Sequence, residues 1–375
     1  VSEKTIGHWN GDGNWFYLCI LSPTPSPTPS PPSPQSAHAC HVGVGFSLAF
    51  QVNRLDIHEA AGKLYALGVR CVRLWHYTSD YLQALWEAGI RDVMVTVPTH
   101  DLPALSEPGA NAKATEVAQT LRPFYEDGMR FRVNVGNEPM ATWEGGLSNA
   151  PLLLPSLENL QTALQQEGLL NVTCTVAFFN GIMGTSYPPE NGAFSSEYVS
   201  TISEVADFLY RTGGDFNVHI YPWFARIGDP QNVPLDLALG ITEHTINGRH
   251  YNGLLHQQIA AARAALNRLD AKYASVPISV GESGWPSGGH TEATLAHARE
   301  YTQYVIDATS REDVPLDPNL GTVFLFEAFD EQGKAAAGHG GGGSETENNF
   351  GIMYESGELK YDVSFLPTPS PTPSP

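Results

Sequence analysis

Two glutamates stand where predicted strands end, and carboxyl side chains can act as acids, bases or nucleophiles. Glu138 follows the run Phe131–Gly136, with Asn137 between them, and Glu282 follows the run Pro277–Gly281. Retaining hydrolysis of a glycoside needs one carboxylate to attack the anomeric carbon and one protonated carboxyl to protonate the leaving oxygen. In so acidic a chain the alternative is two unrelated surface glutamates. The pair therefore predicts retaining glycosidase chemistry if the fold brings the two strand ends together.

Apolar runs and helical patterns alternate along most of the chain. The predicted strands are His41–Phe46, Cys71–Trp75, Asp92–Val97, Phe131–Gly136, Asn171–Phe178, Phe216–Tyr221, Pro277–Gly281 and Thr322–Phe326. The predicted helices are Val52–Leu67, Tyr81–Ala88, Lys113–Asp127, Leu157–Gln166, Glu197–Thr212, Leu254–Tyr273 and Thr291–Thr309. Near-continuous apolar strands separated by helices are typical of a parallel sheet that is covered on both faces.

Eight such strands predict an α/β fold, a single (β/α)₈ TIM barrel. Functional side chains of such a barrel stand at the carboxyl ends of its strands, so Glu138 on the fourth strand and Glu282 on the seventh can converge across the opening. A doubly wound open sheet is the alternative. It is disfavoured because no Gly-x-Gly-x-x-Gly turn follows the first strand.

The 28 prolines divide the chain, because 12 of them fall in Ser22–Pro34 and Leu366–Pro375. Proline alternating with serine and threonine favours extended polyproline II and cannot form a core, which predicts linkers over 22–38 and 366–375. The barrel domain is then expected over 39–365. Residues 1–21 are expected to be a remnant of an upstream region with no independent fold.

Composition excludes several classes of function. Lys and Arg total 20 and Asp and Glu total 40, a formal charge of −20, which argues against nucleic-acid binding and anionic membrane surfaces. The longest apolar runs are too short for a membrane span. No histidine or cysteine motif has metal-ligand spacing, so we expect no metal and no cofactor.

The four cysteines have different expected states. Cys40 and Cys71 precede or open consecutive predicted strands, so a disulfide between them is geometrically possible. Cys174 lies inside an apolar strand, where a free buried thiol is the commoner state. The sequence does not decide the pairing of Cys19.

An ordered set of motifs over residues 42–365 resembles the plant and fungal β-1,3-glucanases of glycoside hydrolase family 17. The set comprises Val72–Trp75, Val93–Leu102, Gly136–Pro139, Gly184–Pro189, Tyr221–Phe224, Gly281–Ser287, Phe326–Lys334 and Glu347–Ile352. The resemblance implies that Glu138 is the acid/base and Glu282 the nucleophile. It also implies that Asn137 hydrogen-bonds the sugar 2-hydroxyl, a contact that strengthens in the transition state.

Further positions of the resemblance surround the substrate cleft. Tyr221 is expected to hold the nucleophile through its hydroxyl or to line the cleft. Trp285 is expected to offer a flat face to a pyranose ring, with a packed core indole as the alternative. The positions that match charged groups around the cleft are Glu331, Lys334 and Glu347.

Three positions depart from the family pattern and put linkage specificity in question. Phe46 stands where the family has a tyrosine in its first strand, and Thr99 stands where it has an asparagine. His219 replaces the asparagine found two residues before the tyrosine of the sixth strand. Each is expected to lie at a sugar subsite, so Phe46 is included among the substrate-binding predictions.

The resemblance implies a secreted, monomeric endo-β-1,3-glucanase acting on laminarin-like or cell-wall glucan. A glucan transglycosylase and a mixed-linkage β-1,3-1,4-glucanase use the same catalytic pair and remain alternatives. A non-catalytic glucan-binding wall domain is the alternative from another class, and it has no need of Glu138 or Glu282. The extracellular setting is inferred from the Pro-rich linkers and the family.

Overall fold

The computed structural model describes residues 5–9, 15–19, 40–109, 111–338 and 344–365. The expected linkers 22–38 and 366–375 lie outside these residues. The chain divides into two units, residues 1–37 and 38–375. In the first unit, β1 (Thr5–Trp9) and β2 (Trp15–Cys19) form an antiparallel hairpin, within a region for which the sequence predicts no fold of its own.

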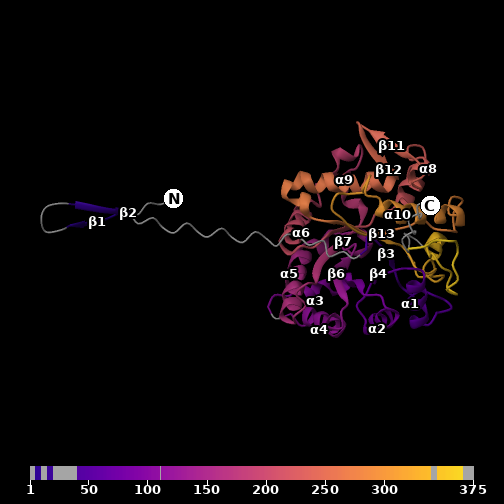
Figure 1. Ribbon diagram of the computed structural model, residues 1–375, viewed down its shortest axis with the longest axis horizontal. Helices are drawn as coiled ribbons and strands as arrows, with labels where there is room; N and C mark the ends of the chain where they lie inside the picture. The colour runs from indigo at the N-terminus through magenta and orange to yellow at the C-terminus, as the bar shows by residue number, and fades with distance from the viewer. Residues whose placement is uncertain (1–4, 10–14, 20–39, 110, 339–343, 366–375) are drawn as a thin grey trace, which may run out of the picture. The chain divides into compact units, whose positions relative to one another are not determined.

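Eight parallel strands of the second unit close into a barrel, with β14 paired to β3 (Figure 1). In barrel order the strands are β3 (Val42–Gly45), β4 (Cys71–Arg73), β5 (Asp92–Val97), β6 (Arg130–Asn137), β7 (Thr173–Phe178), β10 (Phe216–Val218), β13 (Ile278–Ser283) and β14 (Leu320–Leu325). The closed ring confirms the predicted TIM barrel and rules out the open doubly wound sheet.

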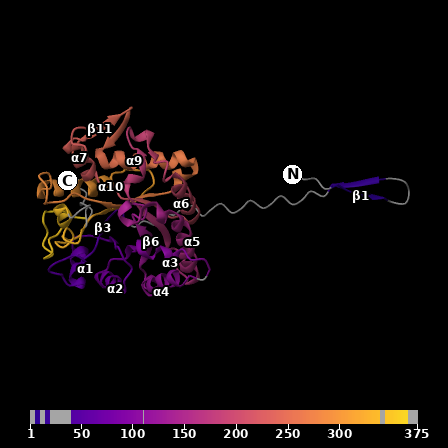
Figure 2. The same ribbon diagram turned by 180° about the vertical axis from the view of Figure 1, so that it is seen from behind.

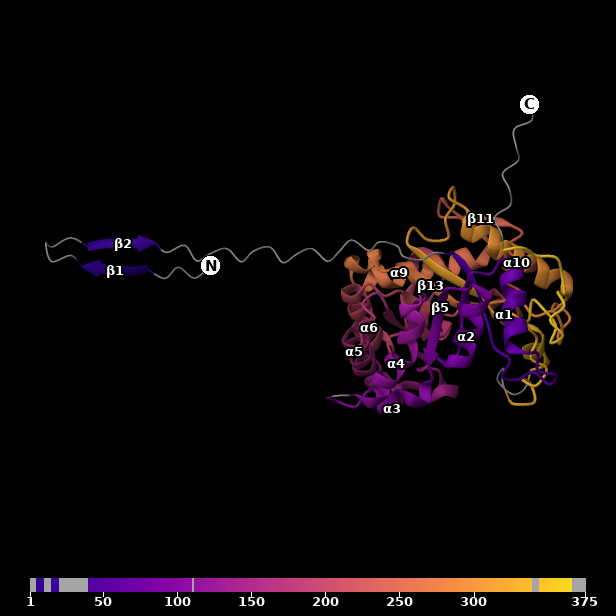
Figure 3. The same ribbon diagram turned by 60° about the horizontal axis from the view of Figure 1, so that its bottom comes forward.

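Helices follow the strands around the outside of the barrel, as Figures 2 and 3 show from two further directions. They are α1 (Ile57–Ala66), α2 (Ser79–Ala88), α3 (Leu102–Leu105), α4 (Ala112–Glu126), α5 (Ala150–Gln166), α6 (Val199–Thr212), α7 (Pro222–Gly228), α8 (Leu235–Ala238), α9 (Gly253–Leu269) and α10 (Leu295–Ser310). Among the described residues no helix is long and apolar enough to cross a membrane.

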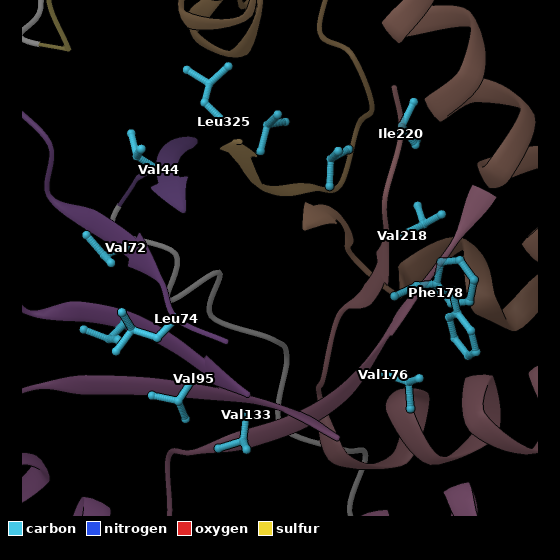
Figure 4. Packing of buried hydrophobic residues seen from close by; sticks show 14 of the residues in the cluster. Val44, Val72, Leu74, Val95, Val133, Val176, Phe178, Val218, Ile220 and Leu325 are labelled. Atoms are coloured by element: carbon cyan, nitrogen blue, oxygen red, sulfur yellow. The ribbon is translucent and has the colours of Figure 1, made fainter. Parts of the chain in front are cut away.

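The apolar core lies between the strands and the helices. Successive residues of a strand face opposite sides of the sheet. Val72 and Leu74 therefore join the large apolar cluster that includes Leu64 of α1 and Leu82 of α2, and Figure 4 shows members of this cluster from successive barrel strands. Arg73, between them in sequence, is fully buried on the opposite side. The alternation thus places polar residues inside the barrel.

Hydrogen bonds between polar side chains fill the barrel interior. Asn217 of β10 donates its amide N–H to Asn134 Oδ1 of β6 over 2.8 Å. Thr96 of β5 donates to the Leu74 carbonyl over 2.8 Å. Because buried polar groups need such partners, these bonds hold the strands together across the barrel interior. The interior is a packed support for the strand ends and not a pore.

The cysteine predictions agree with the structure where they can be compared. Cys40 and Cys71 form a disulfide with their Cα atoms 6.3 Å apart. Cys174 is free and buried, and burial raises the pKa of its thiol. The disulfide ties the segment that leads into β3 to the start of β4.

Small antiparallel hairpins lie outside the barrel sheet, and the sequence analysis did not predict them. They are β8 (Met183–Thr185) with β9 (Ala193–Phe194), and β11 (Glu243–Ile246) with β12 (Arg249–Asn252). The second hairpin turns at Asn247 (φ 49°) and Gly248 (φ 81°). Asn-Gly is a strong signal for a two-residue hairpin turn, so the sequence did contain the information.

Candidate active site

The carboxyl end of β6 presents Glu138 through a turn with unusual backbone angles. Gly136 has φ 83° and Glu138 has φ 50°, and this region is uncommon for a residue with a side chain. The Glu138 N–H donates to the Ala177 carbonyl of β7, and its carbonyl accepts from the Ala141 N–H, both over 2.8 Å. Backbone strain of this kind persists only where the surroundings enforce it, and it concentrates at functional sites.

His219, just beyond β10, contacts both predicted catalytic glutamates. Its Nδ1 lies 2.8 Å from Glu138 Oε1 and 3.5 Å from Glu282 Oε2. Its Nε2 lies 2.9 Å from Arg73 Nη1. Because a carboxylate oxygen can only accept, the proton of the Nδ1 contact lies on the imidazole. His219 therefore donates a hydrogen bond to Glu138.

Three side chains donate hydrogen bonds to the carboxylate of Glu282 at the carboxyl end of β13. Arg73 Nη1 and Trp75 Nε1 each lie 2.8 Å from Oε1, and the Tyr221 hydroxyl donates to Oε2 over 2.9 Å. Burial acts to raise the pKa of Glu282, but His219, the Arg73 charge and the hydrogen bonds outweigh it and lower the pKa below its usual value. Glu282 is thus held ionised, as a nucleophile must be.

Tyr221 keeps its proton and serves as a donor. Burial, followed by the negative charge of Glu282, raises the pKa of its hydroxyl well above the usual value. Its ring packs against Phe224 and Phe326, with centroids 5.0 and 6.1 Å away. The structure therefore places Tyr221 beside Glu282.

Asn137 is fixed from two directions. Its backbone N–H donates to the Thr99 hydroxyl over 3.1 Å, and that hydroxyl also contacts the Asn137 carbonyl over 3.1 Å. Its side-chain Oδ1 accepts from Arg73 Nη2 over 2.5 Å. Arg73 therefore contacts both Glu282 and Asn137, the residue before Glu138. Thr99 fixes the backbone of Asn137.

The two glutamates are close enough to act on one glycosidic bond. Both carboxylates lie near His219 Nδ1, so Glu138 Oε1 and Glu282 Oε2 are separated by no more than the sum of its distances to them. Two carboxyl groups that share a neighbour in this way can reach the same glycosidic bond.

A buried lysine pairs with two of the glutamates that follow β14. Lys334 Nζ lies 2.6 Å from Glu327 and 2.9 Å from Glu331, and 4.3 Å from the centre of the Phe326 ring. Burial acts to lower the pKa of Lys334, but the two carboxylates outweigh it and raise it. Burial also raises the pKa of Glu327 well above its usual value. The sequence analysis did not single out Glu327.

Glu347 is half-buried and lies within the electrostatic reach of both Glu138 and Glu282. Burial raises its pKa to about 7; Lys334 opposes that shift, while Glu282 and Glu138 add to it. Glu347 therefore carries a proton below neutral pH in the folded protein.

Three of the predicted substrate contacts are corrected by burial. Phe46 is 0% exposed and packs on Tyr81 and Phe329, so its ring has no face for a sugar. Trp285 is 2% exposed and packs within the core, where its indole N–H donates to the Glu292 carbonyl over 2.9 Å, as in the core alternative. The carboxylate of Glu331 is also fully buried. It accepts from the Ser47 hydroxyl over 2.9 Å and acts on the site only through Lys334.

Several site residues were not identified from the sequence. Arg73 and Trp75 lie in a quoted motif but received no role, and His219 was noted only as a departure from the family. Trp143, whose indole N–H donates to Glu138 Oε2 over 3.1 Å, was not considered. The sequence did contain a signal for Arg73. An arginine within a buried barrel strand needs a partner for its charge, and such a partner marks a polar site. No comparable signal in the sequence distinguishes Trp143.

One group of potential metal ligands occurs in the described part of the chain. It consists of Cys40, Cys71 and Asp92. The two sulfurs are joined as a disulfide and offer no thiolate, and Asp92 accepts from Arg132 over 3.0 Å. These residues do not fit a metal site.

A closed parallel barrel that sets two glutamates against each other at the carboxyl ends of β6 and β13 has the architecture of a barrel glycosidase. Residues 44–365 match the family model described as "Glycosyl hydrolases family 17". The chain belongs to this family and is a glycoside hydrolase.

Individual relatives agree with this assignment. A glucan endo-1,3-beta-glucosidase of Vitis vinifera is 34% identical over 336 residues, which cover 88% of this chain and 92% of the relative. Among solved structures, a beta-1,3-glucanase and allergen of Cryptomeria japonica pollen superposes with a TM-score of 0.77 at 26% identity, over 88% of this chain and all of that one. A structure described among two plant beta-glucan endohydrolases with distinct substrate specificities gives a TM-score of 0.76 at 28% identity, over 86% of this chain and all of that one.

Proposed function

We propose that the protein is an extracellular endo-β-1,3-glucanase that cleaves its glucan with retention, using Glu282 as nucleophile and Glu138 as acid/base. The observation that carries the proposal is the shared contact of both carboxylates with His219 Nδ1, at 2.8 and 3.5 Å. Proximity of the pair, together with the donors that hold Glu282 ionised, favours direct attack by that carboxylate.

In the first step, Glu282 attacks the anomeric carbon while Glu138 protonates the leaving oxygen. The C–O bond to the leaving sugar breaks, and a glycosyl ester forms on Glu282. Arg73, Trp75 and Tyr221 hold the attacking carboxylate ionised and fixed in orientation. Asn137, held by Arg73 and Thr99, is then available to the sugar 2-hydroxyl.

In the second step, Glu138 acts as a base. It takes a proton from water, the water oxygen bonds to the anomeric carbon, and Glu282 departs as a carboxylate. Two inversions restore the original β configuration. His219 and Trp143 hold the two oxygens of Glu138 through both steps.

The β-1,3-glucan substrate and the internal cleavage are proposed from the named activities of the relatives together with the geometry of the pair in this chain. The extracellular location is supported by the Cys40–Cys71 disulfide, because such bonds persist mainly in oxidising compartments. Substrate contacts are proposed for Asn137, Tyr221, Lys334 and Glu347.

The test is a product profile from laminarin, with the Glu282→Gln variant beside the parent protein. A matched control is Glu204→Gln, which removes an exposed carboxyl on α6. We expect short β-1,3-oligosaccharides from the parent and the control, and none from Glu282→Gln. Cleavage only of a mixed-linkage glucan would refute the β-1,3 assignment. Binding without cleavage of either glucan would refute the catalytic role.

A further inference from the structure

Trp143 is a large apolar side chain that the fold leaves in solvent. It is 67% exposed, in the 3₁₀ turn Thr142–Glu144 that follows β6. Burial of a large apolar side chain stabilises a folded protein, and an exposed tryptophan forgoes most of that gain. The described contacts of its indole are few. Its N–H donates to Glu138, and its ring meets Phe179 edge to face with centroids 5.6 Å apart.

The loop that carries Trp143 is fixed on both sides of it. The side-chain amide of Asn149 donates to the Pro139 carbonyl and to the Glu144 carbonyl, both over 2.8 Å. Gly145, with φ 112°, completes the turn after Glu144. An exposed side chain on a loop held in this way is preorganised, so a ligand that binds it loses little additional entropy.

The contact with Glu138 decides which part of a glucan would reach Trp143. Glu138 delivers its proton to the oxygen of the departing sugar, so that sugar lies beside the acid/base and on the opposite side of the scissile bond from the glycosyl ester. Trp143 lies within hydrogen-bonding distance of the same carboxyl group. Phe179 covers at most one face of its indole, because the contact is edge to face at 76°.

We propose that Trp143 forms the binding platform for the glucosyl unit on the leaving-group side of the scissile bond, and that the same platform receives sugar acceptors. The proposal rests on the proposed function. Axial C–H groups of a β-glucopyranose present an apolar face that matches an indole. Retention of a sugar there after the first step gives the glycosyl–enzyme an alternative to water.

Transfer to a bound acceptor follows the same chemistry as hydrolysis. The acceptor hydroxyl oxygen bonds to the anomeric carbon, its proton moves to Glu138, and the ester bond to Glu282 breaks. The products are a longer β-glucan and the free carboxylate, with no further reactant needed. Water and the acceptor therefore compete for one intermediate and use one base.

This competition gives a direct test. A nitrophenyl β-laminaribioside serves as donor, because its leaving group is not a sugar, and laminaribiose serves as acceptor. The ratio of transfer product to hydrolysis product measures acceptor binding, and effects of a substitution on Glu138 cancel because both routes use the same base. For Trp143→Ala we expect this ratio to fall about tenfold at fixed acceptor concentration, equivalent to ~1.4 kcal/mol.

A second variant separates the contribution of the aromatic face to acceptor binding from the contribution of the indole N–H group. Trp143→Phe keeps an aromatic face but cannot donate to Glu138, so we expect it to keep the ratio within about threefold of the parent, a difference of less than ~0.7 kcal/mol. Tyr210→Ala, which removes an aromatic ring from α6, is the matched control and should leave the ratio unchanged.

Each other outcome has a defined meaning. An unchanged ratio in Trp143→Ala, or an equal fall in Trp143→Ala and Trp143→Phe, would overturn the platform. Folded Trp143→Ala and Trp143→Leu variants that consume no donor would also overturn it, because Trp143 would then act only through Glu138. A parent protein that leaves the donor intact would instead refute the proposed function.

Discussion

Replacing Arg73 by methionine should show how strongly the buried guanidinium stabilises the carboxylate of Glu282. Arg73 is fully buried, and its guanidinium donates to Glu282, to the Gly281 carbonyl and to Asn137 over 2.8, 2.7 and 2.5 Å. Removing one partner of a buried ion pair leaves an uncompensated charge and costs ~3–5 kcal/mol. We expect a loss of this size in the free energy of unfolding of Arg73→Met at pH 7.

The double variant Arg73→Met/Glu282→Gln tests the cause. With the carboxylate also gone, no uncompensated charge remains, so the double variant should be more stable than Arg73→Met by at least ~1.5 kcal/mol. Arg73 helps to lower the folded-state pKa of Glu282, so the contribution of their pair is present above the usual carboxyl range and is lost as pH falls. The difference between parent and Arg73→Met should therefore narrow at pH 4.

Denaturant unfolding of the parent, Arg73→Met, Glu282→Gln and the double variant at pH 7 and pH 4 supplies the comparison. Glu204→Gln again controls for loss of an exposed carboxyl. Equal losses in Arg73→Met and the double variant at pH 7, or a difference that widens at pH 4, would refute the reasoning. Either result would mean that Glu282 does not depend on the charge of Arg73.

Three further changes have defined outcomes. His219→Phe removes the hydrogen-bond donor to Glu138, so kcat/KM should fall, while His219→Asn, which keeps a side-chain N–H donor, should lose less; equal losses in the two variants would contradict the contact. The folded-state pKa of Glu347 is raised to about 7 from 4.5, so its contribution to stability is full below pH 4.5 and is lost as pH rises through 7. Tm should therefore fall less between pH 5 and pH 8 in Glu347→Gln than in the parent, and equal falls would contradict this. The disulfide closes a separation of 31 residues, so Cys40→Ser/Cys71→Ser should lose roughly 3–4 kcal/mol in chemical denaturation; a loss below ~1 kcal/mol would refute the estimate from chain entropy.

The barrel was predictable because its strands are buried on both sides. The run Asp92–Val97 was predicted with its observed bounds, since a buried strand consists of consecutive apolar or β-branched residues. The β11–β12 hairpin was missed because its strands are short and polar, although its Asn247-Gly248 turn is a strong local signal.

The meeting of Glu138 and Glu282 was predictable because the ends of strands follow from the sequence, whereas the directions of side chains near those ends do not. Phe46 and Trp285 both stand close to strand ends, yet their rings pack into the core. Neither direction follows from strand period, because the chain leaves regular geometry at these points. His219 contacts Arg73 and Glu138, which come from two other strands and are distant from it in the sequence. A pattern of neighbouring residues cannot predict such contacts.

The most direct test of the account is the configuration of the first product. Proton NMR of laminari-oligosaccharide cleavage, recorded before the sugar mutarotates, distinguishes the two anomers of the new reducing end. The account predicts that the β-anomer appears first, because two displacements at Glu282 restore the starting configuration. Initial formation of the α-anomer would show a single displacement by water and would contradict the assignment of Glu282 as nucleophile.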